Sequence, residues 1–204
     1  MSEDGGFYPG RSSPGVDAWQ AAFLLVRAFL YFLPAFVANP TAVLFGGGRP
    51  IDGGRVLRDG QRLFGDGKTW AGLAGGIASG GCLGVLISFG ALAVYPSLSY
   101  GTPLASLIFP FLFSMGALAG DLLGSFLKRR MGRPKGAETL GLDQYDFVLG
   151  SVLVLLLVQP VWFWNTFLAG EAWVGFLFII VITPFLHRAV NIIGYRMGKK
   201  EVPW

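Results

Sequence analysis

The stretch that decides the fold class is GLAGGIASGGCLGVLISFGALAVY, residues 72–95, which is 24 residues long and contains no charged side chain. An α-helix needs about 20 mostly apolar residues to cross the hydrocarbon core of a bilayer. The chain lacks the short segments of alternating polar and apolar residues that mark the strands of a membrane β-barrel. We therefore expect a membrane-spanning α-helix at 72–95.

Four further stretches have the same character, and together they predict an all-α integral membrane protein with five transmembrane helices. Hydrophobic residues make up 53% of the chain and charged residues 14%, whereas ordinary globular proteins carry roughly 25% charged residues. The single Cys82 excludes a disulfide within the chain. We expect one transmembrane domain over residues 1–204, with helices at about 17–38, 72–95, 103–127, 147–168 and 172–195.

The basic residues are concentrated on one side of this predicted bundle. Fourteen of the 16 Lys and Arg residues fall in the loops 39–71 and 128–146 or near the C-terminus, and the connections 96–102 and 169–171 contain none. The positive-inside rule places these two loops and the C-terminus in the cytoplasm and the N-terminus outside. Nucleic-acid binding is not expected, because basic loops beside a membrane with few aromatic residues offer little surface for base stacking.

Glycines recur every fourth residue in two of the expected helices. Such small-residue stripes let a second helix approach closely. We expect them to pack helices within the bundle, and a homodimer interface is the alternative. The two stripes are Gly72, Gly76, Gly80 and Gly84 in the second helix, and Gly116, Gly120 and Gly124 in the third.

Three carboxylates lie at the cytoplasmic boundary of the expected bundle. Asp121 precedes Lys128 by seven residues, or about 10 Å along a helix, while Asp143 and Asp146 stand at the entry to the fourth helix. Such a set suggests a site for a hard divalent cation such as Mg²⁺, which takes one or two protein carboxylates plus substrate phosphates. The alternatives are an ion pair for Asp121 and a helix cap for Asp143.

The first cytoplasmic loop has the composition of a phosphate-binding segment. Its glycines leave backbone N–H groups open to an anion, and its Lys and Arg residues supply positive charge. A loop that only touched anionic lipid headgroups would not need Asp52, Asp59 and Asp66 interleaved with the basic residues. The run GDGKT at 65–69 is not a Walker A motif, because the earlier glycine and the preceding strand are missing.

The two polar regions resemble the archaeal CDP-archaeol synthases, which are integral-membrane cytidylyltransferases dependent on CTP. The first carries the motif pieces NP, PID, DGQR and GDGKTWAG between residues 39 and 72. The second carries GD, SFLKR and LDQYD between residues 120 and 146 and is also similar to the C-terminal signature of bacterial CDP-diacylglycerol synthases. It departs from the bacterial pattern, since it has no Pro-Gly-His-Gly-Gly run and has Gln144 where an Arg is usual.

This resemblance implies transfer of CMP from CTP to the membrane lipid 2,3-bis-O-(geranylgeranyl)-sn-glycerol 1-phosphate, yielding unsaturated CDP-archaeol and pyrophosphate. It implies Mg²⁺ as cofactor, held by Asp121, Asp143 and Asp146. The expected catalytic residues are Lys68, Asp121 and Lys128. The residues expected to bind CTP or a substrate phosphate are Asn39, Arg62, Gly65, Asp66, Gly67, Thr69 and Arg129.

Two other functions fit parts of the pattern. A CDP-alcohol phosphatidyltransferase would require an Asp-x-x-x-Asp sequence, which the chain does not contain, and its Arg would stand five residues after Asp59 instead of at Arg62. A small anion transporter would distribute polar residues through the bundle and on its outer side, whereas here they cluster at the cytoplasmic side.

Overall fold

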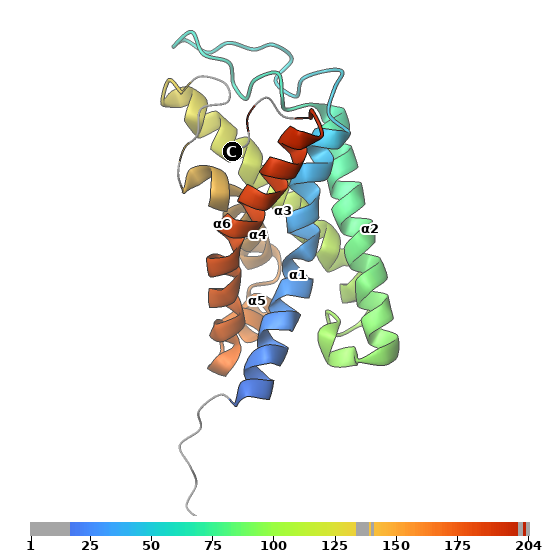
Figure 1. Cartoon of the computed structure of the whole chain (residues 1–204). Helices are drawn as coiled ribbons and strands as arrows, with labels where there is room; N and C mark the ends of the chain where they lie inside the picture. Colours follow the sequence, from blue (N-terminus) through green and yellow to red (C-terminus); the bar gives the residue numbers. More distant parts are fainter. Residues whose placement is uncertain (1–16, 134–138, 140, 200–201, 203–204) are drawn as a thin grey trace, which may run out of the picture.

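The computed structural model describes residues 17–133, 139, 141–199 and 202. Within these ranges the backbone forms six α-helices, two short 3₁₀ turns and no β-sheet. The helices stand side by side in a bundle, with the long connection between α1 and α2 lying across one end (Figure 1). The elements are α1 (Ala18–Leu44), α2 (Trp70–Val94), α3 (Pro103–Arg130), α4 (Leu142–Val158), α5 (Pro160–Phe167) and α6 (Trp173–Arg196), with 3₁₀ turns at Pro96–Leu98 and Gly170–Ala172.

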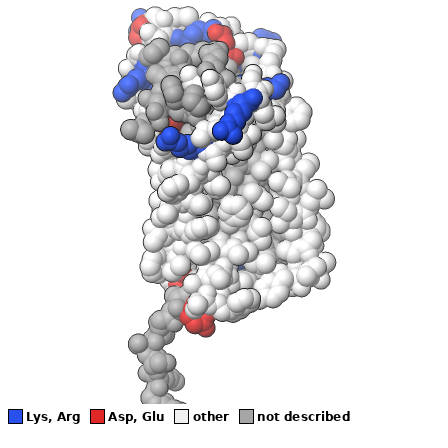
Figure 2. Space-filling model, in the orientation of Figure 1, with Lys and Arg blue, Asp and Glu red and all other residues white. Residues whose placement is uncertain are grey.

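The surface of the bundle is that of a membrane protein. Four helices of the described part are long and apolar enough to cross a membrane: α1, α2, α3 and α6, the last two with their preceding turns. Large apolar side chains point outward along the middle of the bundle, among them Leu86 at 72% exposed and Leu157 at 74%. Lys and Arg side chains gather at one end in Figure 2, while acidic side chains are visible at both ends.

The expected helix at 147–168 is divided in two, so the described residues form six α-helices where five were expected. α4 ends at Val158 and α5 begins at Pro160, and Gln159 between them leaves the helical region with φ −140° and ψ 57°. Proline has no N–H to continue the hydrogen-bond ladder and disfavours the helical conformation of the residue before it. Pro160 therefore ends α4 and occupies the first position of α5.

The first helix extends further than expected, to Leu44 instead of residue 38. It continues through Pro40, and the hydroxyl of Thr41 donates to the carbonyl oxygens of Val37 at 2.6 Å and Ala38 at 3.1 Å. Pro40 has no N–H for the carbonyl of Phe36, and membrane helices tolerate internal prolines where neighbouring helices and side chains compensate. Asn39, expected in the first loop, consequently lies on α1.

Both glycine stripes serve contacts inside the chain. A Cβ atom added at Gly80 would lie 2.4 Å from the carbonyl oxygen of Pro34, so α2 packs directly on the backbone of α1. A Cβ added at Gly120 would lie 2.0 Å from the carbonyl oxygen of Asp146, and one at Gly150 would lie 2.2 Å from that of Gly116. The backbones of α3 and α4 therefore touch, which places Asp146 against α3.

An aromatic core fills the bundle between the charged end and the opposite end. Phe32 of α1, Phe113 of α3 and Phe167 of α5 are fully or almost fully buried and contact one another edge to face. Tyr31 and Tyr100 stack with ring centroids 4.6 Å apart, and the Tyr100 hydroxyl donates to the Tyr31 carbonyl at 2.9 Å. This core fixes the helices whose ends carry the polar residues.

Candidate active site

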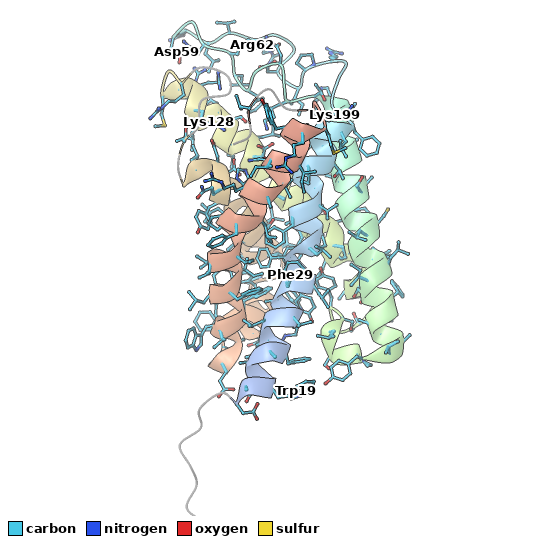
Figure 3. All side chains as sticks on the ribbon, in the orientation of Figure 1. Trp19, Phe29, Asp59, Arg62, Lys128 and Lys199 are labelled. Carbon is cyan, nitrogen blue, oxygen red and sulfur yellow. The ribbon has the colours of Figure 1, made fainter. Side chains whose placement is uncertain are left out.

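The charged end of the bundle is built from the first loop, residues 45–69, and from the adjacent ends of α3 and α4. Figure 3 shows Asp59, Arg62 and Lys128 at this end, while Trp19 marks the opposite end. The sequence-predicted residues lie on four elements: half of them on the loop, Asn39 on α1, and the others in the C-terminal part of α3 and the first turns of α4.

Asp52 organises the first loop, a role that sequence analysis missed. Its side chain is completely buried. One carboxylate oxygen accepts from the Arg62 guanidinium at 2.6 Å, and the other accepts from the backbone N–H groups of Phe64 at 3.1 Å and Gly65 at 3.0 Å. Arg62 and these amides hold the pKa of Asp52 well below its usual range. In the sequence, Asp52 appears only as an acidic residue within a basic loop, and this pattern does not predict that its side chain is buried.

Arg62 and Asp66, both predicted to bind nucleotide or phosphate, are paired with each other in this structure. The Arg62 guanidinium donates to Asp66 at 2.7 Å while its other nitrogens contact Asp52. Gly65 has φ +100°, a conformation that favours glycine, and this turn directs its N–H toward Asp52. A Cβ at Gly67 would meet nothing within 4 Å, so the backbone there lies open.

The end of the loop is fixed where it enters α2. Thr69 is the N-cap residue of α2, and its hydroxyl oxygen accepts from the N–H groups of Gly72 at 3.1 Å and Gly47 at 3.3 Å. The N–H of Ile51 donates to the carbonyl of Lys68 at 2.8 Å. These bonds fix the backbone of Lys68 at the end of the loop, directly before α2.

Two lysine–aspartate pairs join the three elements of the site. Lys68 of the loop pairs with Asp121 of α3. Lys128, in the last turn of α3, donates to Asp143 in the first turn of α4 at 2.7 Å, and the other oxygen of Asp143 accepts from the N–H of Thr139 at 2.9 Å. Asp121 therefore makes an ion pair with a loop residue. The alternative left open by the sequence was an ion pair with a neighbouring helix.

Asp146 is the third predicted metal ligand and is 7% exposed. A Cβ at Gly124 would lie 2.5 Å from one Asp146 carboxylate oxygen, so the absence of a side chain at 124 makes room for that carboxylate against α3. The other oxygen accepts from the N–H of Phe147 at 2.7 Å. The charges of Asp121, Lys68 and Lys128 all act on Asp146. The two lysine–aspartate pairs and Asp146 therefore form one group of interacting charges, which we call the electrostatic unit.

The three predicted metal ligands are not gathered around one point. Within the described residues, no group of three or more His, Cys, Asp or Glu side chains is placed so that it could hold a metal ion. Asp121 and Asp143 are each neutralised by a lysine. Mg²⁺ needs only one or two protein carboxylates when substrate phosphates supply the other ligands, so the donor set fits the ion without a three-carboxylate cage.

Two further predicted residues lie on α1 and α3. Asn39, near the end of α1, has a buried side-chain oxygen with no hydrogen-bond partner in the described part of the chain. An unpaired buried polar atom is costly and is most simply explained by a missing ligand or water. Arg129 follows Lys128 in the last turn of α3. Parts of the second expected loop, residues 134–138 and 140, lie outside the described ranges.

Comparison with known proteins gives a consistent result. Residues 22–204 match a model of CarS-like CDP-archaeol synthases. The chain is 47% identical over 180 residues to a CDP-archaeol synthase of Thermococcus onnurineus, covering 88% of this chain and 97% of that protein. It is 48% identical over 172 residues to one of Methanoculleus marisnigri, covering 84% and 99%.

A solved structure of an intramembrane enzyme of archaeal membrane lipid biosynthesis is also similar. It shares 40% sequence identity with the chain, with a TM-score of 0.63, and the alignment covers 82% of this chain and 94% of that structure.

Proposed function

Because the chain belongs to the CDP-archaeol synthase family, we propose that it transfers CMP from CTP to the phosphate of 2,3-bis-O-(geranylgeranyl)-sn-glycerol 1-phosphate. The products are unsaturated CDP-archaeol and pyrophosphate. The observation that carries this proposal is the electrostatic unit of Lys68, Lys128, Asp121, Asp143 and Asp146 at one end of a membrane bundle. The family relationship removes the basis for the phosphatidyltransferase and transporter alternatives.

The chemistry suits these residues. A phosphate oxygen of the lipid attacks the α-phosphorus of CTP and pyrophosphate leaves, so the site must neutralise two anionic reactants and hold them in line. Lys68 and Lys128 are placed to donate to phosphate oxygens, because their side chains remain 26% and 17% exposed at the surface of the site. The carboxylates beside them hold these ammonium groups in position before the substrates arrive.

Mg²⁺ is the proposed cofactor, held directly or through water by one or two of the expected ligands Asp121, Asp143 and Asp146, with substrate phosphates supplying the other ligands. When bound, the ion would neutralise charge on the triphosphate. The unpaired oxygen of Asn39 supports its place in the CTP site, where a donor group of the nucleotide would satisfy it. We assign the rest of that site to Arg62, Gly65, Asp66, Gly67, Thr69 and Arg129.

The proposed membrane topology has five crossings. We infer that α4 and α5 cross the membrane together, because α4 starts at the charged end and α5 leads into α6 at the opposite end (Figure 1). The charged end would face the cytoplasm by the positive-inside rule, where CTP is available. The N-terminal 16 residues, expected outside, lie beyond the described ranges. A homodimer is proposed only as an assembly compatible with this topology.

The proposal is tested by pyrophosphate release from purified protein in detergent, with CTP, Mg²⁺ and the geranylgeranylated glycerol phosphate. We expect release to require all three components and to fall by about 100-fold or more in Asp121→Asn. Asp17→Asn is the matched control, because it makes the same change at the far end of α1, where asparagine also caps a helix. Wild-type protein that binds CTP but releases no pyrophosphate would contradict the proposal.

A further inference from the structure

The tip of the first loop is a compact hairpin. Leu57 N–H donates to the Gln61 carbonyl at 2.9 Å, and Gly60 N–H donates to the Leu57 carbonyl at 3.0 Å. One oxygen of Asp59 accepts from the N–H of Gln61 at 3.1 Å, which closes the turn. Because these bonds join its two arms and its turn, a contact at one point of the hairpin restrains all of it.

One side chain outside the loop holds this hairpin. Arg130, the last residue of α3, donates to the free oxygen of Asp59 at 2.5 Å and to the carbonyls of Arg62 at 2.7 Å and Gln61 at 3.2 Å. Its guanidinium also lies over the ring of Phe126, 5.4 Å from the centroid, which fixes the direction of the side chain. A planar guanidinium is suited to several simultaneous contacts of this kind, and a lysine is not.

These contacts continue to the site. Arg130 binds the carbonyl of Arg62, whose guanidinium binds Asp52. Asp52 binds the N–H of Gly65, whose carbonyl accepts from the backbone N–H of Lys68 at 3.2 Å. The Lys68 side chain then reaches Asp121, back on α3. The loop is therefore attached to α3 at two points, nine residues or about 13 Å apart.

We propose that Arg130 is a positioning residue for the reaction. Its hydrogen bonds hold the loop tip against α3 and so keep Lys68 beside Asp121. This inference rests on the proposed function, in which Lys68 donates to phosphate. When Lys68 turns from Asp121 to a phosphate, the attachment at Asp121 loosens and Arg130 continues to hold the loop. Both terminal nitrogens of the Arg130 guanidinium bind the hairpin, so the role assigned to Arg130 is to hold the loop.

The first test measures, without any substrate, how firmly Arg130 holds the loop. Amide hydrogen exchange is compared between wild type, Arg130→Ala and Arg58→Ala in detergent. Arg58 is the matched control, since it lies on the same hairpin, carries the same charge, and makes no hydrogen bond or ion pair with the residues that the structure describes. We expect Arg130→Ala to exchange the amides of 57–65 about tenfold faster, with α3 and α4 unchanged, and Arg58→Ala to match wild type.

The second test separates positioning from a general structural role. We expect Arg130→Ala to lower kcat about tenfold or more with a smaller change in KM for CTP, because misplacing Lys68 affects the transition state more than binding. Arg130→Lys should be intermediate. Asp59→Ala should cause little further loss when combined with Arg130→Ala, since both residues act in one contact.

Two results would overturn the inference: loop exchange in Arg130→Ala equal to that in Arg58→Ala, or an unchanged kcat despite faster exchange. Failure of the proposed function looks different. In that case wild type itself releases no pyrophosphate, and the exchange experiment still reports whether Arg130 holds the loop.

Discussion

The buried carboxylate of Asp52 accepts hydrogen bonds from three backbone amides and from two nitrogens of Arg62. Hydrogen bonds to a charged group contribute about 1.5–3 kcal/mol each, and burial makes their loss costly. Asp52→Ala would leave Arg62 and the amides of Phe64 and Gly65 without their acceptor. We expect it to disorder the loop and lower kcat/KM by about tenfold or more, measured beside Arg58→Ala.

The same carboxylate makes the loop sensitive to acid. Its pKa is lowered in the folded protein by Arg62 and the backbone amides, so its stabilising effect is complete above the unfolded pKa of about 4 and is lost as the pH falls below it. We expect the NMR amide signals of Phe64 and Gly65 to have their folded chemical shifts at pH 7. These shifts should change only at a pH below the pKa of a free aspartate. Loss of these signals above pH 5 would contradict the assignment.

Residue types in the sequence identified candidate site residues but did not predict how their side chains pair. Lys68, Asp121, Lys128 and Asp143 were all named from motif and spacing, and the structure brings them together as two ion pairs. Asp52 and Arg130 were missed, because burial and loop geometry depend on contacts between segments far apart in the chain. The roles of the named residues in catalysis and metal binding remain predictions.

At the scale of single elements, α3 and α4 depend on glycine for their contact. A Cβ at Gly120 would lie 2.0 Å from a backbone oxygen of α4, and backbone cannot move aside as a flexible side chain can. Overpacking of this kind costs about 1–3 kcal/mol. Gly120→Ala should therefore lower the unfolding temperature in detergent and reduce activity, because it displaces Asp146.

Gly90→Ala in α2 is the matched control, because a Cβ there meets nothing within 4 Å. It should leave the unfolding temperature unchanged or raise it slightly, since alanine favours helix over glycine by about 1 kcal/mol. Equal unfolding temperatures for the two variants would contradict the packing described for α3 and α4.

The positions of the long helices followed from apolar length, whereas their ends depended on local chemistry. Pro160 carried the signal for the break between α4 and α5, since proline ends a helix unless neighbours compensate. Pro40 carried the same signal but does not end α1. There α1 packs closely on α2, with Gly72 and Gly76 facing the carbonyl oxygens of Ala42 and Ala38. A proline rule applied to sequence alone does not include such packing.

For the whole molecule, the one-sided charge predicts orientation. In a Cys82→Ser background, a membrane-impermeant maleimide applied to intact cells should label Trp19→Cys at the end opposite the site. It should label Arg58→Cys on the first loop only after the cells are opened. Both positions are exposed, so the difference reports the side of the membrane and not burial. Labelling of Arg58→Cys in intact cells would place the site outside and contradict the proposed topology.

The measurement that tests the proposed reaction most directly follows the phosphorus atoms of CTP. Purified protein is given the geranylgeranylated glycerol phosphate and Mg²⁺ with CTP labelled at either the α- or the γ-phosphate. Cytidylyl transfer predicts that the α-label moves into the solvent-extracted lipid, while the γ-label stays in water as pyrophosphate. A γ-label in the lipid, or no label in it from either nucleotide, would contradict the proposed function.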